Sequence, residues 1–184
     1  MTPPAPSPDV PDNDAAHELR ARLDFDDARL LAECDIHLHR AGGPGGQHRN
    51  KVSSAVRLVH RPTGFTVTAS ERRSQHENRA NALHRLREAI AIGVRSTVPV
   101  QVVWPDSVNI RNGQLKVGAQ NPALCHVLAL ALDALAAYGG QVGKAAAHLG
   151  VTTSSLTRFL ADHPKAWVEA NRIRQHAGLA PLRA

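Results

Sequence analysis

One glycine-rich segment points most directly to chemistry. Residues 41–51 read AGGPGGQHRNK, with four glycines in the five positions 42–46. Neither a helix nor a strand can use such a run, so we expect a loop that is mobile or that adopts positive φ angles. Glycines of this kind let a backbone N–H approach a reacting group closely. The segment is therefore the first candidate for a catalytic or nucleotide-binding loop.

The two common nucleotide-binding patterns do not fit this loop. A dinucleotide-binding loop needs GxGxxG, but the sixth position counted from Gly43 is His48. A Walker loop needs GxxxxGK followed by Ser or Thr, whereas the pair Gly143-Lys144 is followed by Ala145. Both interpretations are excluded.

Histidines and cysteines give no clear metal site or nucleophile. His37 and His39 have no third ligand at a fixed spacing, and the sequence contains no HExxH and no GxSxG. Cys34 and Cys125 are far apart and form no CxxC pair, which excludes a disulfide framework and a cysteine zinc site and indicates a reducing compartment. We expect no metal and no organic cofactor.

The residues from Gly42 to Lys51 resemble the GGQ loop of class I peptide chain release factors. The resemblance covers about residues 34–92 and continues beyond the loop in separate blocks at the family's spacing. These blocks are Ser54-Ala55-Val56-Arg57, His60-Arg61-Pro62-Thr63-Gly64, Glu71-Arg72-Arg73-Ser74-Gln75, Asn78-Arg79 and Ala82-Leu83. Arg49 departs from the family, which usually has a small apolar residue there. A second Gly-Gly-Gln at 139–141 lacks such flanks, and we interpret it as a structural turn.

The resemblance implies hydrolysis of the ester that joins a nascent peptide to tRNA, in the peptidyl transferase centre of the ribosome. Gly45 and Gly46 would leave no side chain to collide with RNA, and the backbone N–H of Gln47 would donate to charge developing on the ester. The neutral Gln47 amide would shape a pocket for water and cannot act as a general base. The family also implies N5-methylation of Gln47 and hence a glutamine methyltransferase as a partner.

The net charge of +6 is concentrated in two blocks. Residues 1–35 carry net −6, residues 36–96 net +8, residues 97–139 net zero and residues 140–184 net +4. Local positive charge favours a polyanionic partner, here ribosomal RNA and the P-site peptidyl-tRNA. The residues expected to bind RNA are Arg49, Asn50, Lys51, Arg57, Arg72, Arg73, Ser74, Gln75, Arg79, Arg158, Lys165, Arg172 and Arg174.

Hydrophobic periodicity predicts the elements that position these residues. Alternation predicts a strand at 34–40, then a β-hairpin with strands at 56–60 and 65–69, and later extended segments at 98–104 and a second hairpin around Asn112-Gly113. One helix is expected from about Ala15 to Leu31, with an interruption at 24–27, and another after the cap Ser74. Further helices are expected at about 122–137, 141–149, 153–161 and 164–176.

The expected fold is α+β. A small GGQ domain, with a mixed or antiparallel sheet, a packed helix and a mobile glycine-rich loop, precedes a C-terminal helical, helix-turn-helix-like module. In that module Gly150 would make the turn and Thr152 or Thr153 the cap. The expected boundaries are a disordered N-terminus at 1–14, the GGQ domain with its leading helix at 15–96, an extended or hairpin connection at 97–118 and the helical module at 119–184.

The function expected from these features is codon-independent release of peptide from stalled ribosomes. The 46 residues before Gln47 are too few for the stop-codon-reading superdomain of full-length release factors, so the chain resembles the short rescue members. The alternative is a non-catalytic nucleic-acid- or ribosome-binding protein that uses the helix-turn-helix-like module. Because no signal peptide or run of about 18 apolar residues occurs, we expect a cytoplasmic protein without membrane contact. We also expect the protein to be monomeric.

Overall fold

The computed structural model describes residues 13–39 and 54–183, and these ranges form an α+β fold. The sheet strands are β1 (Cys34–His39), β2 (Ala55–His60) and β3 (Thr66–Ala69), with a separate hairpin of β4 (Asn109–Arg111) and β5 (Gln114–Lys116). The helices are α1 (Asn13–Arg20), η1 (Ala21–Asp24), α2 (Asp27–Ala32), α3 (Gln75–Gly93), α4 (Leu124–Ala137), α5 (Val142–His148), α6 (Thr153–Ala161) and α7 (Pro164–His176). Residues 1–12, most of the expected disordered N-terminus, lie outside the described ranges, and α1 begins at Asn13.

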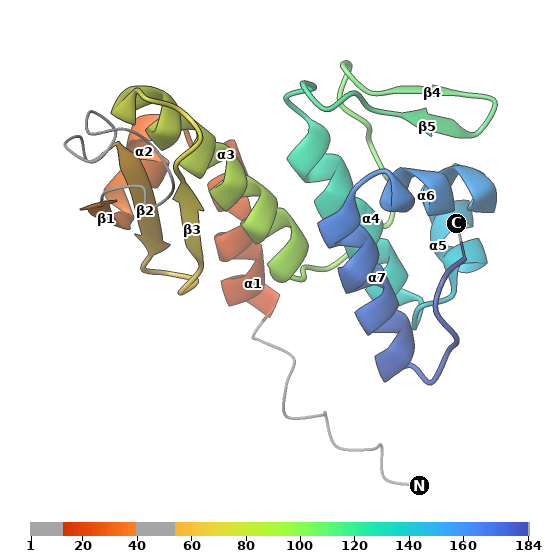
Figure 1. Cartoon of the computed structure of the whole chain (residues 1–184). Coiled ribbons are helices and arrows are strands. Elements are labelled where there is room, and N and C mark those ends of the chain that lie inside the picture. The colour runs from red at the N-terminus through yellow and green to blue at the C-terminus, as the bar shows by residue number, and fades with distance from the viewer. Residues whose placement is uncertain (1–12, 40–53, 184) are drawn as a thin grey trace, which may run out of the picture.

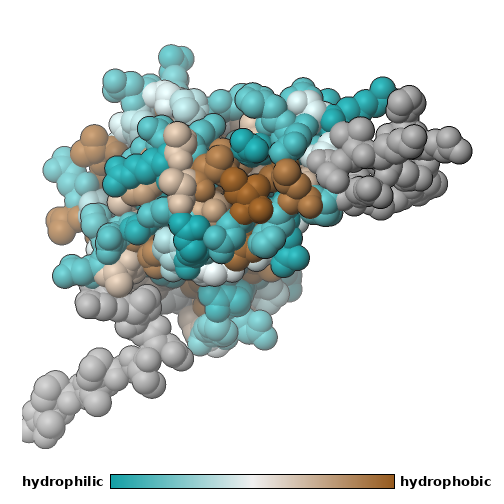
Figure 2. Space-filling view, turned by 90° about the vertical axis from the view of Figure 1, so that its left-hand side faces the viewer, coloured by the Kyte–Doolittle hydropathy of each residue, from teal (hydrophilic) through white to brown (hydrophobic). Residues whose placement is uncertain are grey.

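The three-stranded sheet is antiparallel, with the order β1-β2-β3. Its register pairs Ile36 with Leu58 and Leu58 with Val67, so these side chains share one face. Helix α3 covers this face at β2 and β3, where Leu58 is fully buried. The same face continues onto the edge strand β1, where Ile36 is 40% and Leu38 49% exposed. Figure 2 looks at the side of the molecule where β1 lies and shows hydrophobic surface among hydrophilic residues.

Helix α3 is the central element of the molecule. Its N-terminus is capped by Ser74, whose hydroxyl accepts a hydrogen bond from the Glu77 N–H at 3.3 Å, as the sequence predicts. Buried Leu83, Leu86 and Ile90 belong to a continuous hydrophobic core that joins the sheet to the C-terminal helices. Figure 1 shows α3 between the sheet on one side and α4 on the other.

The C-terminal helices are built around α4, in which ten of the fourteen residues are buried. Helices α5 and α6 form the expected helix-turn-helix, with Gly150 at φ +68° in the turn. Thr152, and not Thr153, caps α6, because its hydroxyl accepts a hydrogen bond from the Ser155 N–H at 3.2 Å. Between α3 and β4, residues 94–108 run without helix or strand.

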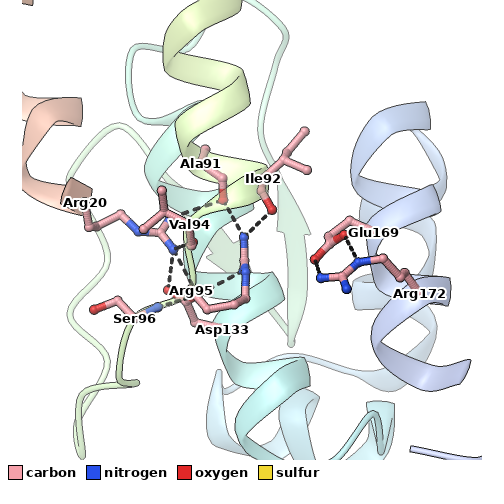
Figure 3. Close-up of polar contacts among 9 residues, drawn as sticks. All are labelled: Arg20, Ala91, Ile92, Val94, Arg95, Ser96, Asp133, Glu169 and Arg172. Atoms are coloured by element: carbon pink, nitrogen blue, oxygen red, sulfur yellow. Dashed lines mark hydrogen bonds and ion pairs between the residues drawn. The ribbon is translucent and has the colours of Figure 1, made fainter. Parts of the chain in front are cut away.

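A buried charged cluster joins the two halves of the molecule (Figure 3). The Asp133 carboxylate on α4 accepts hydrogen bonds from Arg20 at the end of α1 (2.8 and 2.9 Å) and from Arg95 after α3 (2.9 Å). Both guanidinium groups also donate to the Ala91 carbonyl near the C-terminal end of α3. The end of α3 is therefore fixed against α1 and α4 together.

Candidate functional site

The glycine-rich segment joins two neighbouring strands. β1 ends at His39 and β2 begins at Ala55, and these two residues are partners across the antiparallel pair. The chain therefore leaves the sheet and returns to it at adjacent positions. The expected catalytic residues Gly45, Gly46 and Gln47, and the expected RNA-binding residues Arg49, Asn50 and Lys51, lie outside the described residues.

The fully buried side chain of Asn78 holds the start of β2 in place. Its Nδ2 donates to the carbonyls of Ser54 (2.7 Å) and Arg72 (2.8 Å), and its Oδ1 accepts from the Arg72 N–H (2.9 Å). One amide on α3 thus ties the residue before β2 to the segment between β3 and α3. Asn78 belongs to one of the blocks that match the release-factor family, but no local pattern assigns it this role, because Arg72 and Ser54 lie six and 24 positions before it in the sequence.

A second polar network lies at the opposite end of the β1–β2 pair. Fully buried His60 lies 3.0 Å from Glu33 through Nε2 and 2.7 Å from the Thr63 hydroxyl through Nδ1. Burial lowers the pKa of His60, although the Glu33 carboxylate opposes this effect. Burial alone would raise the pKa of Glu33, but the bonds from His60 and Arg22 outweigh it and lower this pKa. Neutral His60 therefore donates from Nε2 to Glu33 and accepts from Thr63.

The expected RNA-binding residues in the described part of this half do not form one cluster. Arg57 is exposed on the sheet face opposite to α3, whereas Arg79 lies partly buried on α3. Exposed Arg72 and Arg73 precede the helix, and Asn78 holds the Arg72 backbone beside Ser54. Ser74 caps α3, and Gln75 is the first residue of that helix.

Three of the four expected RNA-binding residues near the C-terminus have partners within the chain. Lys165 pairs with Glu88 on α3, and Arg172 pairs with Glu169 through two hydrogen bonds of 2.7 and 2.8 Å. Arg174 donates to the carbonyls of Gly140 (2.6 Å) and Ala180 (2.8 Å). Arg158 on α6 is exposed and lines a groove beside β5. The second Gly-Gly-Gln contributes to a turn after α4, with φ values of +56° at Gly139 and +75° at Gly140.

The described residues give little support for a reactive cysteine or for a metal site. Burial raises the pKa of the Cys34 thiol to about 11 and also raises that of Cys125, so both thiols stay protonated near neutral pH. Within residues 13–39 and 54–183, no group of three His, Cys, Asp or Glu side chains is placed to hold a metal ion. No helix in these ranges is long and apolar enough to span a membrane.

Comparison with known proteins gives one family match. The model of the RF-1 domain matches residues 30–101. Peptide chain release factor 1 of Caldicellulosiruptor bescii is 56% identical over 55 residues, which are 30% of this chain and 16% of that protein. Peptide chain release factor 2 of Paramagnetospirillum magneticum is 55% identical over 56 residues, 30% of this chain and 15% of its own length. Release factor 1 of Gluconobacter oxydans is 44% identical over 72 residues, 39% and 19% of the two chains.

The match has clear limits along the structure. It begins within α2, includes the three-stranded sheet, the glycine-rich segment and α3, and ends at residue 101. The β4–β5 hairpin and helices α4–α7 lie beyond it. The shared segment spans less than a fifth of each of these relatives.

Proposed function

Residues 30–101 form an RF-1 domain, the GGQ-containing domain of the class I release factor family, and we propose that this chain hydrolyses the ester of peptidyl-tRNA on the ribosome. One observation carries the proposal. The matched segment contains Gly45-Gly46-Gln47 on the connection between β1 and β2. The proposed site of action is the peptidyl transferase centre, and the proposed compartment is the cytoplasm.

The proposed reaction is attack of water on the ester carbonyl. The bond between the peptide's acyl carbon and the tRNA oxygen breaks, and the peptide acid and tRNA are released. The backbone N–H of Gln47 donates a hydrogen bond to negative charge that develops on the ester oxygens. Gly45 and Gly46 let the backbone approach RNA closely, and the Gln47 amide admits water and excludes larger nucleophiles. Because this amide is neutral, water is oriented by it and not deprotonated by it.

The described scaffold supports this role by holding both ends of the catalytic segment. The β1–β2 pairing places its ends next to each other, and Asn78 fixes the Ser54 carbonyl to α3. A loop that enters an RNA-lined site needs such a base, because an error of about 1 Å in position can reduce the rate about 10²-fold.

We further propose that release does not depend on the codon in the A site. The helices before the sheet support this proposal, since η1 and α2 pack on α3 as part of the same core as the RF-1 domain. Residues 21–32 thus support that domain. Peptide release from stalled ribosomes is the corresponding biological role.

Release from purified ribosome–peptidyl-tRNA complexes tests both levels of the proposal. Complexes with a stop codon, a sense codon or no codon in the A site are mixed with the full chain, and released labelled peptide is measured. We expect similar rates on stop and sense codons and the highest rate where the mRNA ends near the P site. A strong preference for stop codons would overturn codon independence but keep the hydrolase activity. No release on any complex would overturn the hydrolase proposal itself.

A second candidate function is non-catalytic binding of nucleic acid or of the ribosome. The helix-turn-helix of α5 and α6, which lies outside the RF-1 match, favours it. This candidate predicts that ribosome binding survives in the assay above while release is absent.

We also propose that the chain acts as a monomer and that a glutamine methyltransferase modifies Gln47. Light scattering of the full chain tests whether it is a monomer. Mass spectrometry of the peptide that contains Gln47 tests whether this residue is methylated.

A further inference from the structure

A groove lies between the β4–β5 hairpin and helix α6, outside the RF-1 domain. Its volume is about 490 Å³. One wall is β5 with Lys116, and the other is α6 with Ser154, Ser155 and Arg158. Figure 1 shows this hairpin beside α6, at the end of the molecule away from the β1–β2–β3 sheet. The walls thus present two cations and several hydroxyl groups.

The two walls of the groove are held together by direct hydrogen bonds. The Thr152 N–H donates to the Gly113 carbonyl and the Leu115 N–H donates to the Ser155 hydroxyl, each at 2.8 Å. The hairpin turn has φ +51° at Asn112 and φ +71° at Gly113, as a two-residue hairpin turn requires. A Cβ at Gly113 would lie only 3.0 Å from the Thr152 methyl. The groove is therefore preformed, with both walls in fixed positions.

The positive charge at this groove is available to an external partner. Lys116 and Arg158 are exposed, and within the described residues neither forms an ion pair. Lys165 and Arg172, in contrast, already pair with Glu88 and Glu169. A free cation can neutralise a phosphate without first losing a carboxylate partner, so the groove favours anions more than the outer surface of α7 does.

Two further exposed cations lie near the N-terminal end of α6. Arg111 lies next to the hairpin turn that contacts Thr152. Lys144 follows Gly143, at which a Cβ would be 3.9 Å from the Thr153 hydroxyl. One carboxylate, that of Asp162, lines the groove at the C-terminal end of α6. Exposed cations and hydroxyl groups thus occur at both the hairpin and the helix that form the groove.

We infer that this groove binds the phosphodiester backbone of ribosomal RNA, with Lys116 and Arg158 as the phosphate contacts. The choice of RNA rests on the proposed function. The molecule would then contact RNA at two ends, with the sheet that carries the catalytic segment at one end and the groove at the other. The rigid connection through α3 would let binding at the groove hold the RF-1 domain in place.

Ribosome affinity of full-length variants across a series of salt concentrations tests the inference. The double variant Lys116→Ala/Arg158→Ala should bind more weakly and lose about two units from the slope of log affinity against log salt, one for each phosphate contact. The matched control Lys165→Ala/Arg172→Ala removes the same charge from α7 and should keep the wild-type slope. Equal changes in the two double variants, or wild-type binding by the groove variant, would overturn the inference.

A variant with increased ribosome affinity distinguishes a change in the binding groove from a loss of folding. Asp162→Asn removes the carboxylate that repels phosphates and should tighten ribosome binding about two- to fivefold at low salt. Unchanged or weaker binding would count against the groove. A DNA duplex that binds the wild-type chain more tightly than ribosomes do, and loses this binding in Lys116→Ala/Arg158→Ala, would overturn the assignment to RNA.

Peptide release distinguishes failure of the groove from failure of the proposed function. The groove double variant should need a higher protein concentration to reach half of its maximal release rate, because its ribosome binding is weaker. An unchanged half-maximal concentration would overturn the role of the groove in binding. If the wild-type chain releases no peptide, the proposed function fails, while the binding comparisons still decide whether the groove holds RNA.

Discussion

At the residue scale, the proposed chemistry depends on backbone geometry more than on any side chain. Gly46→Ala adds a Cβ beside the Gln47 N–H that is proposed to donate to the reacting ester. We expect release to fall about 10²-fold or more, the size of the loss when one such donor is removed. Gln47→Ala keeps the N–H and should cost less. Release is measured at saturating protein, with ribosome binding as the control, and a wild-type rate in Gly46→Ala would overturn the catalytic assignment.

His60 predicts a dependence of stability on pH. Its pKa is lowered in the folded protein, so below pH ~6.5 the unfolded chain binds a proton that the folded chain resists. The contribution of neutral His60 to the free energy of unfolding should therefore be complete above pH ~6.5 and should decrease as the pH falls below this value. Glu33, whose folded pKa is also lowered, should add a further loss as the pH falls below ~4.3.

Urea denaturation between pH 5 and 8 measures this dependence. His60→Gln removes the titrating group, so its stability should change less between pH 7 and 5.5 than that of the wild type, even if it is lower throughout. Parallel pH profiles for the two proteins would show that other groups are responsible.

At the element scale, Asn78 connects α3, the start of β2 and the segment before α3. Asn78→Ala leaves the Ser54 carbonyl and both backbone groups of Arg72 without this partner at a partly buried site. We expect a loss of at least about 2 kcal/mol in the free energy of unfolding. Because Ser54 precedes β2, release should also fall at temperatures where the variant is fully folded, while ribosome binding falls less. Asn78→Asp keeps the acceptor for the Arg72 N–H and should be intermediate in stability. Wild-type release in folded Asn78→Ala would contradict this positioning role.

The elements themselves were largely predictable from local patterns. Alternation located β1, β2 and β3, the Ser74 cap located the start of α3, and Asn112-Gly113 located the turn between β4 and β5. These signals come from residues that are close together in the sequence, so they can be recognised without knowledge of the tertiary contacts. The partners Glu88 of Lys165 and Gly140 of Arg174 could not be predicted in this way, whereas Arg172 and its partner Glu169 lie three positions apart on α7. The long-range partners depend on which elements meet in space, as when α7 brings Lys165 to Glu88, 77 positions away in the sequence.

At the scale of the whole molecule, the RF-1 domain and the C-terminal helices share one core. Leu86 and Ile90 on α3 and Leu128 and Leu132 on α4 belong to the same buried cluster. Truncation after residue 118 would expose this surface of α3 and remove Asp133 from between Arg20 and Arg95. Experiments on the role of the helices therefore need the full chain with substitutions at its surface.

The Arg20–Asp133–Arg95 cluster predicts that the two halves unfold together. Burial raises the pKa of Asp133 and lowers that of Arg20 to about 10, so burial disfavours the charged forms, whereas the pairing of Asp133 with the two arginines favours them. Asp133→Ala leaves two buried guanidinium groups without their carboxylate, and we expect a loss of about 3–5 kcal/mol. Replacing Arg20 and Arg95 with Met and Asp133 with Leu should recover much of this loss, because no unpaired charge then remains.

Two probes can follow the halves separately during this unfolding. Trp104 and Trp167 report on the C-terminal half, since both lie outside the RF-1 match and pack against the core. Amide hydrogen exchange in β2 and α3 reports on the RF-1 domain. In the wild type both probes should give one free energy of unfolding, and Asp133→Ala should lower both by the same amount, because the carboxylate joins α1, the end of α3 and α4. If tryptophan fluorescence changes at lower denaturant while exchange in β2 keeps its wild-type protection, the halves are independent. The groove at α6 could then not hold the RF-1 domain in place.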